Sequence, residues 1–340
     1  MVDLSDSEGR SVRDASAADL TRALSDLQAD PEQFVIVERG PDAFMQARHP
    51  QTDRGRPPLD QVFQLEYKNE PGSVMNLAVS YEFEEIERTV LEYAEGSDSW
   101  LERFRWWPFD IDDRAMDAEA PASVFAAAAQ LIAHEMKPFG FRRIKRDRRL
   151  QRDRGPWTDS IWMHTGSGNR RGHQAVITLS LSVGHVELAS WRSGKPGVGS
   201  GHVDQQQLGY VMPTGPRQAR WNLVGSFELA VADLVYSLTH FALAYFDCFD
   251  DDLTFPERTR ALRSSRLDYI ETLELFVALD RIDLVGPYLT WLGTDHPQAL
   301  QMAKHRRRQL TATTVPGRGS GYEQLADVLH ENDLLDHLPE

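Results

Sequence analysis

Two stretches in the first 110 residues place their apolar side chains at helical spacing. The first runs from Leu20 to Leu27, and Ser16 and Asp19 just before it have the spacing of a capping box. The second runs from Phe83 to Tyr93. Its first turns hold four acidic residues, which the positive end of a helix dipole favours and which we interpret as a solvated face: Glu82, Glu84, Glu85 and Glu87.

Between these two helices the pattern changes to the alternation of β-strands. A Gly-Pro-Asp turn separates segments 34–40 and 43–49, and turn residues including Asn, Pro and Gly separate segments 62–68 and 73–80. We therefore expect two antiparallel hairpins. An aromatic strand within residues 100–110 closes this part of the chain.

The remaining two thirds of the chain predict an Ala-rich helix, then strands, then helices. The first helix covers residues 122–137, and antiparallel strands follow in about 141–191, where the β-branched run 173–186 gives the clearest strand signal. Residues 187–220 contain six Gly and predict a long loop, in which 186–191 is a further candidate strand. Apolar residues then return at helical spacing and predict helices at 226–246, 268–279, 284–292, 297–310 and 322–338.

Together these patterns predict an α+β fold in two domains, each with a small, mainly antiparallel sheet packed against helices. The length of 340 residues suits two domains of roughly 150 residues each. We place the boundary near residue 118, in an acidic stretch that ends at Pro121. Residues 1–118 then form a small domain, and residues 119–340 form a larger one with a helical C-terminal tail.

Composition indicates a cytoplasmic globular protein. The first fifteen residues are polar and acidic, without the apolar stretch of a secretory signal, and the longest apolar stretch, residues 124–133, is shorter than the ~20 residues that cross a bilayer. Cys248 is the single cysteine, so we expect neither a disulfide within the chain nor a multi-cysteine zinc site. We expect Cys248 to pack as a small hydrophobic residue near the end of a helix.

Charge is distributed unevenly along the chain. Residues 142–154 carry eight Arg or Lys against two Asp, a local charge of +6 in a chain of net charge −15, so the other 327 residues sum to −21. On a strand, such a run exposes charged heads on both faces while the Arg stems cover apolar surface. Alternatively, its cations bind an acidic partner or phosphates. The candidate binding residues are Arg142, Arg143, Lys145, Arg146, Arg148, Arg149 and Arg152.

Two further groups are candidate binding residues. Trp106 and Trp107 form either a core strand or an exposed aromatic anchor, with core packing the default interpretation. A cluster of aspartates that follows them either mimics phosphates toward a basic partner or is a solvated linker, and it comprises Asp110, Asp112 and Asp113.

No catalytic, metal or cofactor motif is recognisable. The sequence His134-Glu135 lacks the second His of a zinc-protease motif, and the Gly-rich segment 193–201 has its Lys before the glycines, the wrong order for a phosphate-binding loop. A hydrolase built on the 187–220 loop would bring two or three of four candidate histidines together around a pocket, the candidates being His164, His173, His185 and His202. We therefore favour a protein without enzymatic activity and expect no cofactor.

Two stretches resemble known bacterial families. Residues 16–109, with FVIVERG, FMQA, QLEY and a helix ending in YAEG before Trp100, are similar to the first-numbered immunity family of bacterial polymorphic toxin systems. Residues 128–310, with AQLIAHEMKPFGFRR and VITLSLSVG, resemble the domain of unknown function 4304, in which a helix and a Gly-Phe pair precede basic antiparallel strands. Neither resemblance supplies catalytic residues.

From the first resemblance we expect a non-enzymatic binding protein of immunity type. It would neutralise a partner protein, a toxin effector, through charged surfaces. The alternative is a nucleic-acid-binding or nucleotide-binding component of a bacterial defence system that uses residues 142–154. Nucleic acid is the weaker candidate because the −21 carried by the rest of the chain repels phosphates.

Overall fold

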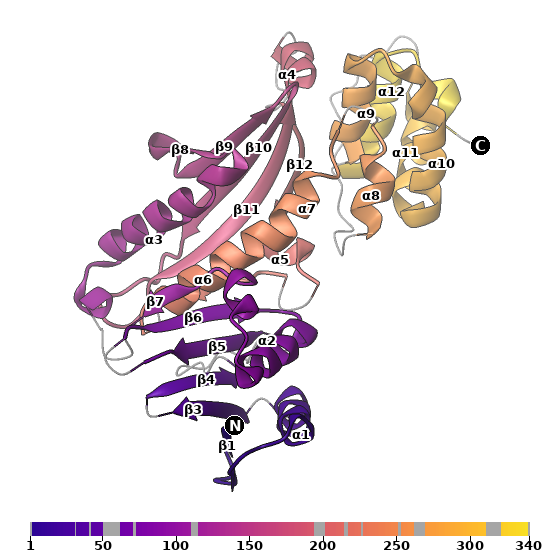
Figure 1. Ribbon diagram of the computed structural model, residues 1–340. Helices are drawn as coiled ribbons and strands as arrows, with labels where there is room; N and C mark the ends of the chain where they lie inside the picture. Colours follow the sequence, from indigo (N-terminus) through magenta and orange to yellow (C-terminus); the bar gives the residue numbers. More distant parts are fainter. Residues whose placement is uncertain are drawn as a thin grey trace. The chain divides into compact units, whose positions relative to one another are not determined.

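The protein has an α+β fold made of antiparallel sheets and helices, which confirms the predicted class (Figure 1). The structure is a computed structural model. It describes residues 2–30, 32–40, 42–49, 62–70, 73–109, 115–193, 201–213, 217–225, 227–250, 253–261, 269–310 and 321–338.

The chain folds into two compact units. Unit 1 contains Met1–Phe139, Met163–Leu179 and Met212–Phe241, and unit 2 contains Gly140–Trp162, Ser180–Val211 and Ala242–Glu340. No single boundary near residue 118 separates them. The reason is that two long strands, β10 (Trp157–Thr165) and β11 (Val176–His185), each contribute one end to each unit.

Unit 1 contains a seven-stranded antiparallel sheet in the order β2-β1-β3-β4-β5-β6-β7. Both predicted hairpins are present, with Val37 opposite Met45 and Leu65 opposite Ala78. The strands are β1 (Asp3–Asp6), β2 (Ser11–Val12), β3 (Phe34–Gly40), β4 (Ala43–Arg48), β5 (Phe63–Lys68), β6 (Met75–Ser80) and β7 (Trp107–Phe109). The expected aromatic strand at 100–110 is reduced to β7, because the 3₁₀ helix η1 (Ser99–Glu102) precedes it.

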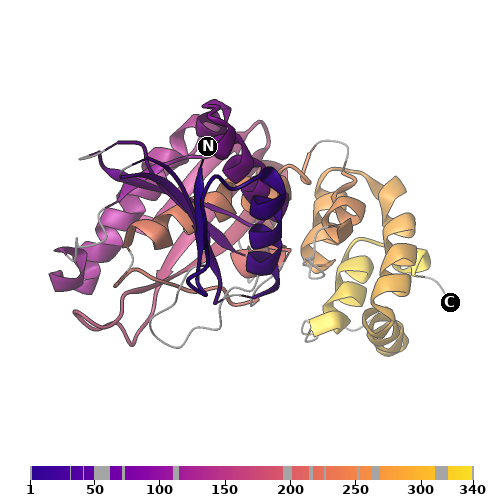
Figure 2. The same cartoon turned by 60° about the horizontal axis from the view of Figure 1, so that its bottom comes forward.

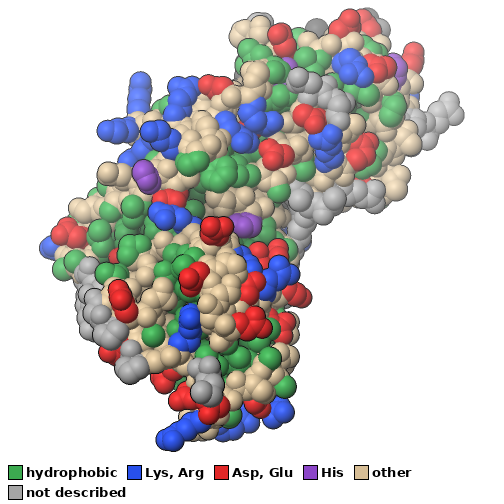
Figure 3. Space-filling view, in the orientation of Figure 1, with side chains coloured by type: hydrophobic (Ala, Val, Ile, Leu, Met, Phe, Trp, Pro, Cys, Tyr) green, Lys and Arg blue, Asp and Glu red, His purple; other side chains and the backbone are tan. Residues whose placement is uncertain are grey.

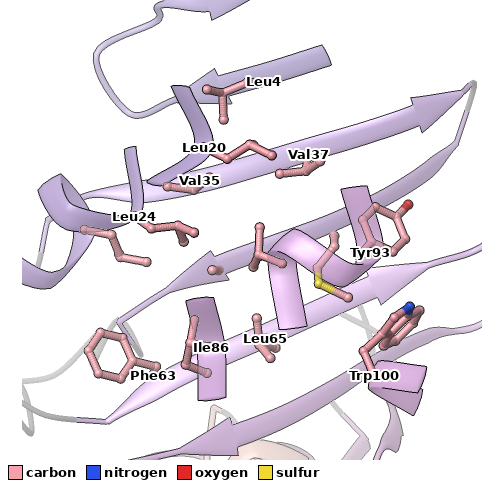
Figure 4. Packing of buried hydrophobic residues seen from close by; sticks show 14 of the residues in the cluster. Leu4, Leu20, Leu24, Val35, Val37, Phe63, Leu65, Ile86, Tyr93 and Trp100 are labelled. Carbon is pink, nitrogen blue, oxygen red and sulfur yellow. The ribbon is translucent and has the colours of Figure 1, made fainter. Parts of the chain in front are cut away.

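Helices α1 (Ala17–Ala29) and α2 (Phe83–Glu95) cover one face of this sheet. The predicted capping box is present: the Ser16 hydroxyl accepts from the Asp19 backbone N–H, and the Asp19 carboxylate accepts from the Ser16 N–H at 3.0 Å. Figure 4 shows how the apolar side chains of both helices meet those of the strands. This core includes Leu20, Leu24, Val37, Leu65, Ile86 and Trp100.

The other helices of unit 1 pack near β6 and β7. Helix α6 (Phe227–Ser237) contacts both strands and also α3 (Pro121–Glu135), and it continues through the π-helix η5 (Leu238–Ala242) into α7 (Leu243–Phe246). By length and composition, the helical segment Phe227–Phe246 could cross a membrane. We did not identify this segment as a candidate from the sequence, because we considered only the apolar stretch 124–133. Inside the structure 67% of the most apolar window of Phe227–Phe246 is buried, as in the core helix of a globular protein.

In unit 2 the sheet order is β12-β11-β10-β9-β8, with strands β8 (Arg142–Ile144), β9 (Arg149–Arg154) and β12 (His202–Gln207) joining the unit 2 ends of β10 and β11. The other end of β11 pairs in unit 1 with β13 (Trp221–Asn222). The expected loop at 187–220 was wrong in part, since it contains α4 (Val186–Ser193), β12 and α5 (Leu208–Val211). Backbone pairing with β11 forms β12 although its Gln-rich sequence lacks an apolar alternation.

Most of the residues that the structure describes in the C-terminal part of unit 2 are helical, as predicted, and a further helix at Phe255–Ala261 was not predicted (Figures 1 and 2). Helix α9 contacts β12 and α4, whereas α10, α11 and α12 pack against one another and against α9. The elements are α8 (Phe255–Ala261), α9 (Tyr269–Ala278), η6 (Ile282–Leu284), α10 (Val285–Asp295), α11 (Pro297–Gln309), η7 (Gly321–Glu323), α12 (Gln324–Glu331) and η8 (Leu335–His337).

Candidate functional site

The basic run forms a hairpin at the edge of the unit 2 sheet. Strands β8 and β9 pair with Arg143 opposite Leu150, and the 3₁₀ turn η4 (Lys145–Asp147) connects them. Arg148 ends this turn in the left-handed region, at φ 51°. Lys and Arg side chains gather over this region of unit 2 in Figure 3. A charged strand was one of the two interpretations of the run.

Two arginines of this hairpin point inward and neutralise a buried acid. Asp159 on β10 is fully buried and accepts from the Arg152 Nε at 2.8 Å. Arg154 donates to both carboxylate oxygens of Asp159, at 2.7 and 3.0 Å, and also to the backbone carbonyls of Phe246 and Phe249. A buried carboxylate needs such partners, so these two cations serve the fold.

Two more cations have partial partners at the surface. Arg142 and Asp153 form an exposed ion pair at 2.8 Å. The guanidinium of Arg149 lies 4.9 Å from the ring centroid of Trp162 and 3.4 Å from the Asp147 carboxylate. Solvent screens exposed pairs of this kind, so they add little to stability and can be exchanged for other partners.

Three cations have no anionic partner among the described residues: Arg143, Lys145 and Arg146. Lys145 and Arg146 are exposed, and Arg143 is half-buried, with an Nε that lacks a hydrogen-bond partner. We call these three residues, together with the neighbouring Arg142 and Arg148, the basic edge. Of its members, Lys145 and Arg146 are exposed and have no anionic partner among the described residues, so these two are the most available to a ligand.

The tryptophans of unit 1 differ from one another. Trp106 packs edge-on against Tyr67 and Trp100 in the core, and its indole N–H donates to the Leu101 carbonyl at 3.1 Å. Trp107 is 7% exposed and lies against the guanidinium of Arg105. The predicted acidic candidates Asp110, Asp112 and Asp113 lie outside the described residues.

Trp107 also lines a pocket of about 500 Å³ in unit 1, which sequence patterns did not reveal. At its polar end, the Ser80 hydroxyl donates to Glu85 at 2.8 Å and lies 3.4 Å from the Tyr236 hydroxyl. Burial raises the pKa of Tyr236, so its phenol stays protonated at neutral pH. The His240 ring stacks on Tyr236 with centroids 3.7 Å apart.

The histidines that a hydrolase would require lie in different surroundings. The His185 ring packs edge-on against Trp157, whereas His202 Nδ1 lies 2.5 Å from the Ser182 hydroxyl. Burial, then Arg149 and Arg192, lower the pKa of His202, which keeps its ring neutral. His164 and His173 are exposed. Among the described residues, no group of three or more His, Cys, Asp or Glu side chains could hold a metal ion.

The single cysteine is unsuited to nucleophilic chemistry. Cys248 is buried, its thiol donates to the Ala244 carbonyl, and burial raises its pKa to about 11. At neutral pH it is therefore a thiol, while nucleophilic attack needs the thiolate.

Comparison with known proteins gave no relative: no family model, no curated protein and no solved structure matches the chain. The basic edge and the pocket are therefore the two candidate sites among the described residues. Sequence reasoning interpreted Glu85 as a solvated helix residue, although it lines the pocket. The polar pair Thr239-His240 inside an apolar helix was the available signal for this site.

Proposed function

We propose that this chain is a non-enzymatic cytoplasmic protein that binds an acidic surface of a partner protein through the basic edge. The single observation that supports this function is the set of three cations, Arg143, Lys145 and Arg146, without an anionic partner among the described residues. Guanidinium groups bind carboxylates with two parallel hydrogen bonds, which gives both strength and orientation. The partner that we propose is a toxin effector, because residues 16–109 resemble an immunity family.

The arrangement of the hairpin supports recognition more than stabilisation. Arg152 and Arg154 hold Asp159 and fix β9, and β9 in turn pairs with β8, which carries Arg143; Lys145 and Arg146 lie in the turn η4 between the two strands. β8 is the last strand in its sheet order and presents a short edge of three residues. Because the anchoring arginines and the exposed cations lie on one hairpin, its backbone is already positioned, and the main ordering cost of binding is that of the Lys145 and Arg146 side chains.

The test is co-purification of the full chain from its native host, with identification of the partner by mass spectrometry and measurement of its affinity. Charge reversal of Lys145→Glu with Arg146→Glu should weaken binding of an acidic partner at least tenfold, roughly 1.4 kcal/mol or more, and the wild-type affinity should fall with added salt. The matched control reverses two exposed cations elsewhere, Lys137→Glu with Arg308→Glu.

Three results would count against this function. They are a partner bound equally well by both double variants, a wild-type affinity that is independent of salt, and the absence of any protein partner. Urea unfolding of each variant shows whether lost binding reflects a lost fold. Since the reversed residues are exposed, both variants should unfold within about 0.5 kcal/mol of the wild type.

Phosphate binding is a second candidate, favoured by the position of Trp162 beside the basic edge. The Trp162 ring stacks with Arg149, and aromatic rings next to cations are a common platform for single-stranded nucleic acid. A single-stranded oligonucleotide should then bind with an affinity that falls steeply with salt. A partner protein that outcompetes the oligonucleotide would favour the first function, and tight, competition-resistant oligonucleotide binding would favour the second.

A further inference from the structure

The pocket of unit 1 has mostly aromatic and aliphatic walls. It lies where β6 and β7 meet the end of α3 and the helix α6–η5, and its apolar surfaces come from Phe104, Trp107, Phe139 and Val235. A volume of about 500 Å³ is within the range of small-molecule sites. Trp107 and Tyr236 are themselves buried, so their rings form firm walls.

Most of the charges around this pocket are already neutralised. Arg103 donates to the Glu92 carboxylate at 2.7 Å and to the Thr89 hydroxyl at 2.8 Å. Arg105 binds Glu135 through two hydrogen bonds, at 3.1 and 3.2 Å. These pairs leave no net charge.

Glu85 is the exception. Its carboxylate accepts one hydrogen bond, from Ser80 at 2.8 Å, and has no cationic partner among the described residues. The Tyr236 hydroxyl lies beyond Ser80 in the same polar corner. The pocket therefore presents one uncompensated negative charge next to aromatic rings.

The backbone that carries Thr239 and His240 is unusual. Thr239 and His240 line the pocket from the π-helix η5, and such single π-turns inside α-helices occur frequently at functional sites. The Thr239 hydroxyl is used within the helix, where it donates to the Val235 carbonyl at 3.0 Å. The π-turn thus places the flat His240 ring, stacked on Tyr236, at the pocket wall.

We infer that this pocket binds a small organic cation, an aromatic primary amine, with its ammonium group at Glu85 and Tyr236 and its ring against Trp107 and Phe104. A carboxylate and neighbouring π-faces both attract a cation, and the apolar walls favour an aromatic body. An anionic ligand of the same shape would meet the uncompensated charge of Glu85. A neutral ligand would lack the ion pair.

Isothermal titration of the full chain with three matched probes tests this assignment: phenethylamine, the neutral 2-phenylethanol and the anionic 3-phenylpropionate. Phenethylamine should bind with a dissociation constant of about 0.1–1 mM, at least tenfold tighter than the alcohol, and the propionate should not bind. Equal binding of the three probes would overturn the assignment. So would the absence of phenethylamine binding at roughly 10 mM, tenfold above the upper end of the expected dissociation constant.

Two variants locate the binding site. Glu85→Gln keeps the shape and the acceptor for Ser80 but removes the charge, and it should weaken phenethylamine binding about tenfold or more. Its control is Glu84→Gln, which removes an exposed charge one residue away and should bind as the wild type does. Ala232→Phe fills the pocket and should abolish binding while the chain stays folded by circular dichroism. Retention of binding in both Glu85→Gln and Ala232→Phe would show that the amine binds elsewhere.

Discussion

The buried layers beside the two sheets of this protein are filled by different kinds of side chain. In unit 1 the face under α1 and α2 is filled by aliphatic and aromatic side chains such as Leu24, Leu65 and Trp100. In unit 2 the buried layer also contains ionic groups, with Asp159 held by Arg152 and Arg154, and Arg192 held by Glu274 at 2.9 Å. Apolar packing is nondirectional, whereas an ion pair fixes geometry.

This difference explains why the basic run looks like a ligand-binding patch in sequence but only partly is one in the structure. Taking a charge out of water costs several kcal/mol, so a buried carboxylate needs cations or hydrogen-bond donors around it. Arg152 and Arg154 satisfy Asp159, and only the remaining cations can serve recognition. The contrast between the ionic layer of unit 2 and the apolar layer of unit 1 can be tested by truncating one buried side chain in each layer.

The largest effect should follow from the ionic layer. Asp159→Ala leaves Arg152 and Arg154 partly buried without their carboxylate and should lower the free energy of unfolding by roughly 3–5 kcal/mol. Urea denaturation at pH 7, followed by circular dichroism, measures this loss. The control is Asp153→Ala, which breaks the exposed pair with Arg142 and should cost less than about 1 kcal/mol. If the two variants lose similar stability, the buried pair has no special role.

A comparable but smaller loss should follow from the apolar layer of unit 1. Leu24 is fully buried, so Leu24→Ala creates a cavity and should cost about 2–4 kcal/mol by the same urea measurement. Unlike the loss in Asp159→Ala, this one should not depend on salt, because no charge is involved. Val74→Ala, at a side chain that is 60% exposed, should change stability by less than about 0.5 kcal/mol. If the stability lost in Leu24→Ala depended strongly on salt, the proposed difference between the apolar and the ionic layer would be contradicted.

The smallest effect concerns a polar atom inside the apolar layer. The Tyr93 hydroxyl is buried and has no hydrogen-bond partner among the described residues, so Tyr93→Phe should be within about 1 kcal/mol of the wild type at pH 7. Burial raises the pKa of Tyr93 to about 12, from its ordinary value of 10. Below pH 10 the Tyr93 phenol is protonated in both the folded and the unfolded chain. As the pH rises from 10 through 12, the unfolded chain loses this proton first, so the free energy of unfolding of the wild type falls.

Tyr93→Phe has no phenol to ionise at this position, so it should resist alkaline unfolding better than the wild type. Melting temperatures measured between pH 9 and about 12 check this expectation. Parallel curves for the two proteins over this range would contradict the assigned burial of the phenol.

Much of the local structure was predictable because it depends on neighbouring residues. The capping box at Ser16, both hairpins of unit 1, the Ala-rich helix and most C-terminal helices follow from spacing and turn residues. Strand β12 was not predictable, because two of its polar residues, Asp204 and Gln206, are buried in the strand that pairs with β11 and contacts α9. Asp204 in that strand is fully buried and accepts from the Tyr245 hydroxyl, 41 residues further along the chain.

The sequence by itself determined the α+β class, the uneven charge and the position of the basic run, since composition and periodicity are properties of the chain. Only the tertiary structure decided which arginines are neutralised internally and which remain at the basic edge. It also decided that Glu85 lines a pocket. The physical reason is that folding brings together partners that are distant in the sequence, such as Arg154 and Phe246 or Ser80 and Tyr236. Folding also sets the dielectric surroundings in which a charge such as that of Asp159 acts.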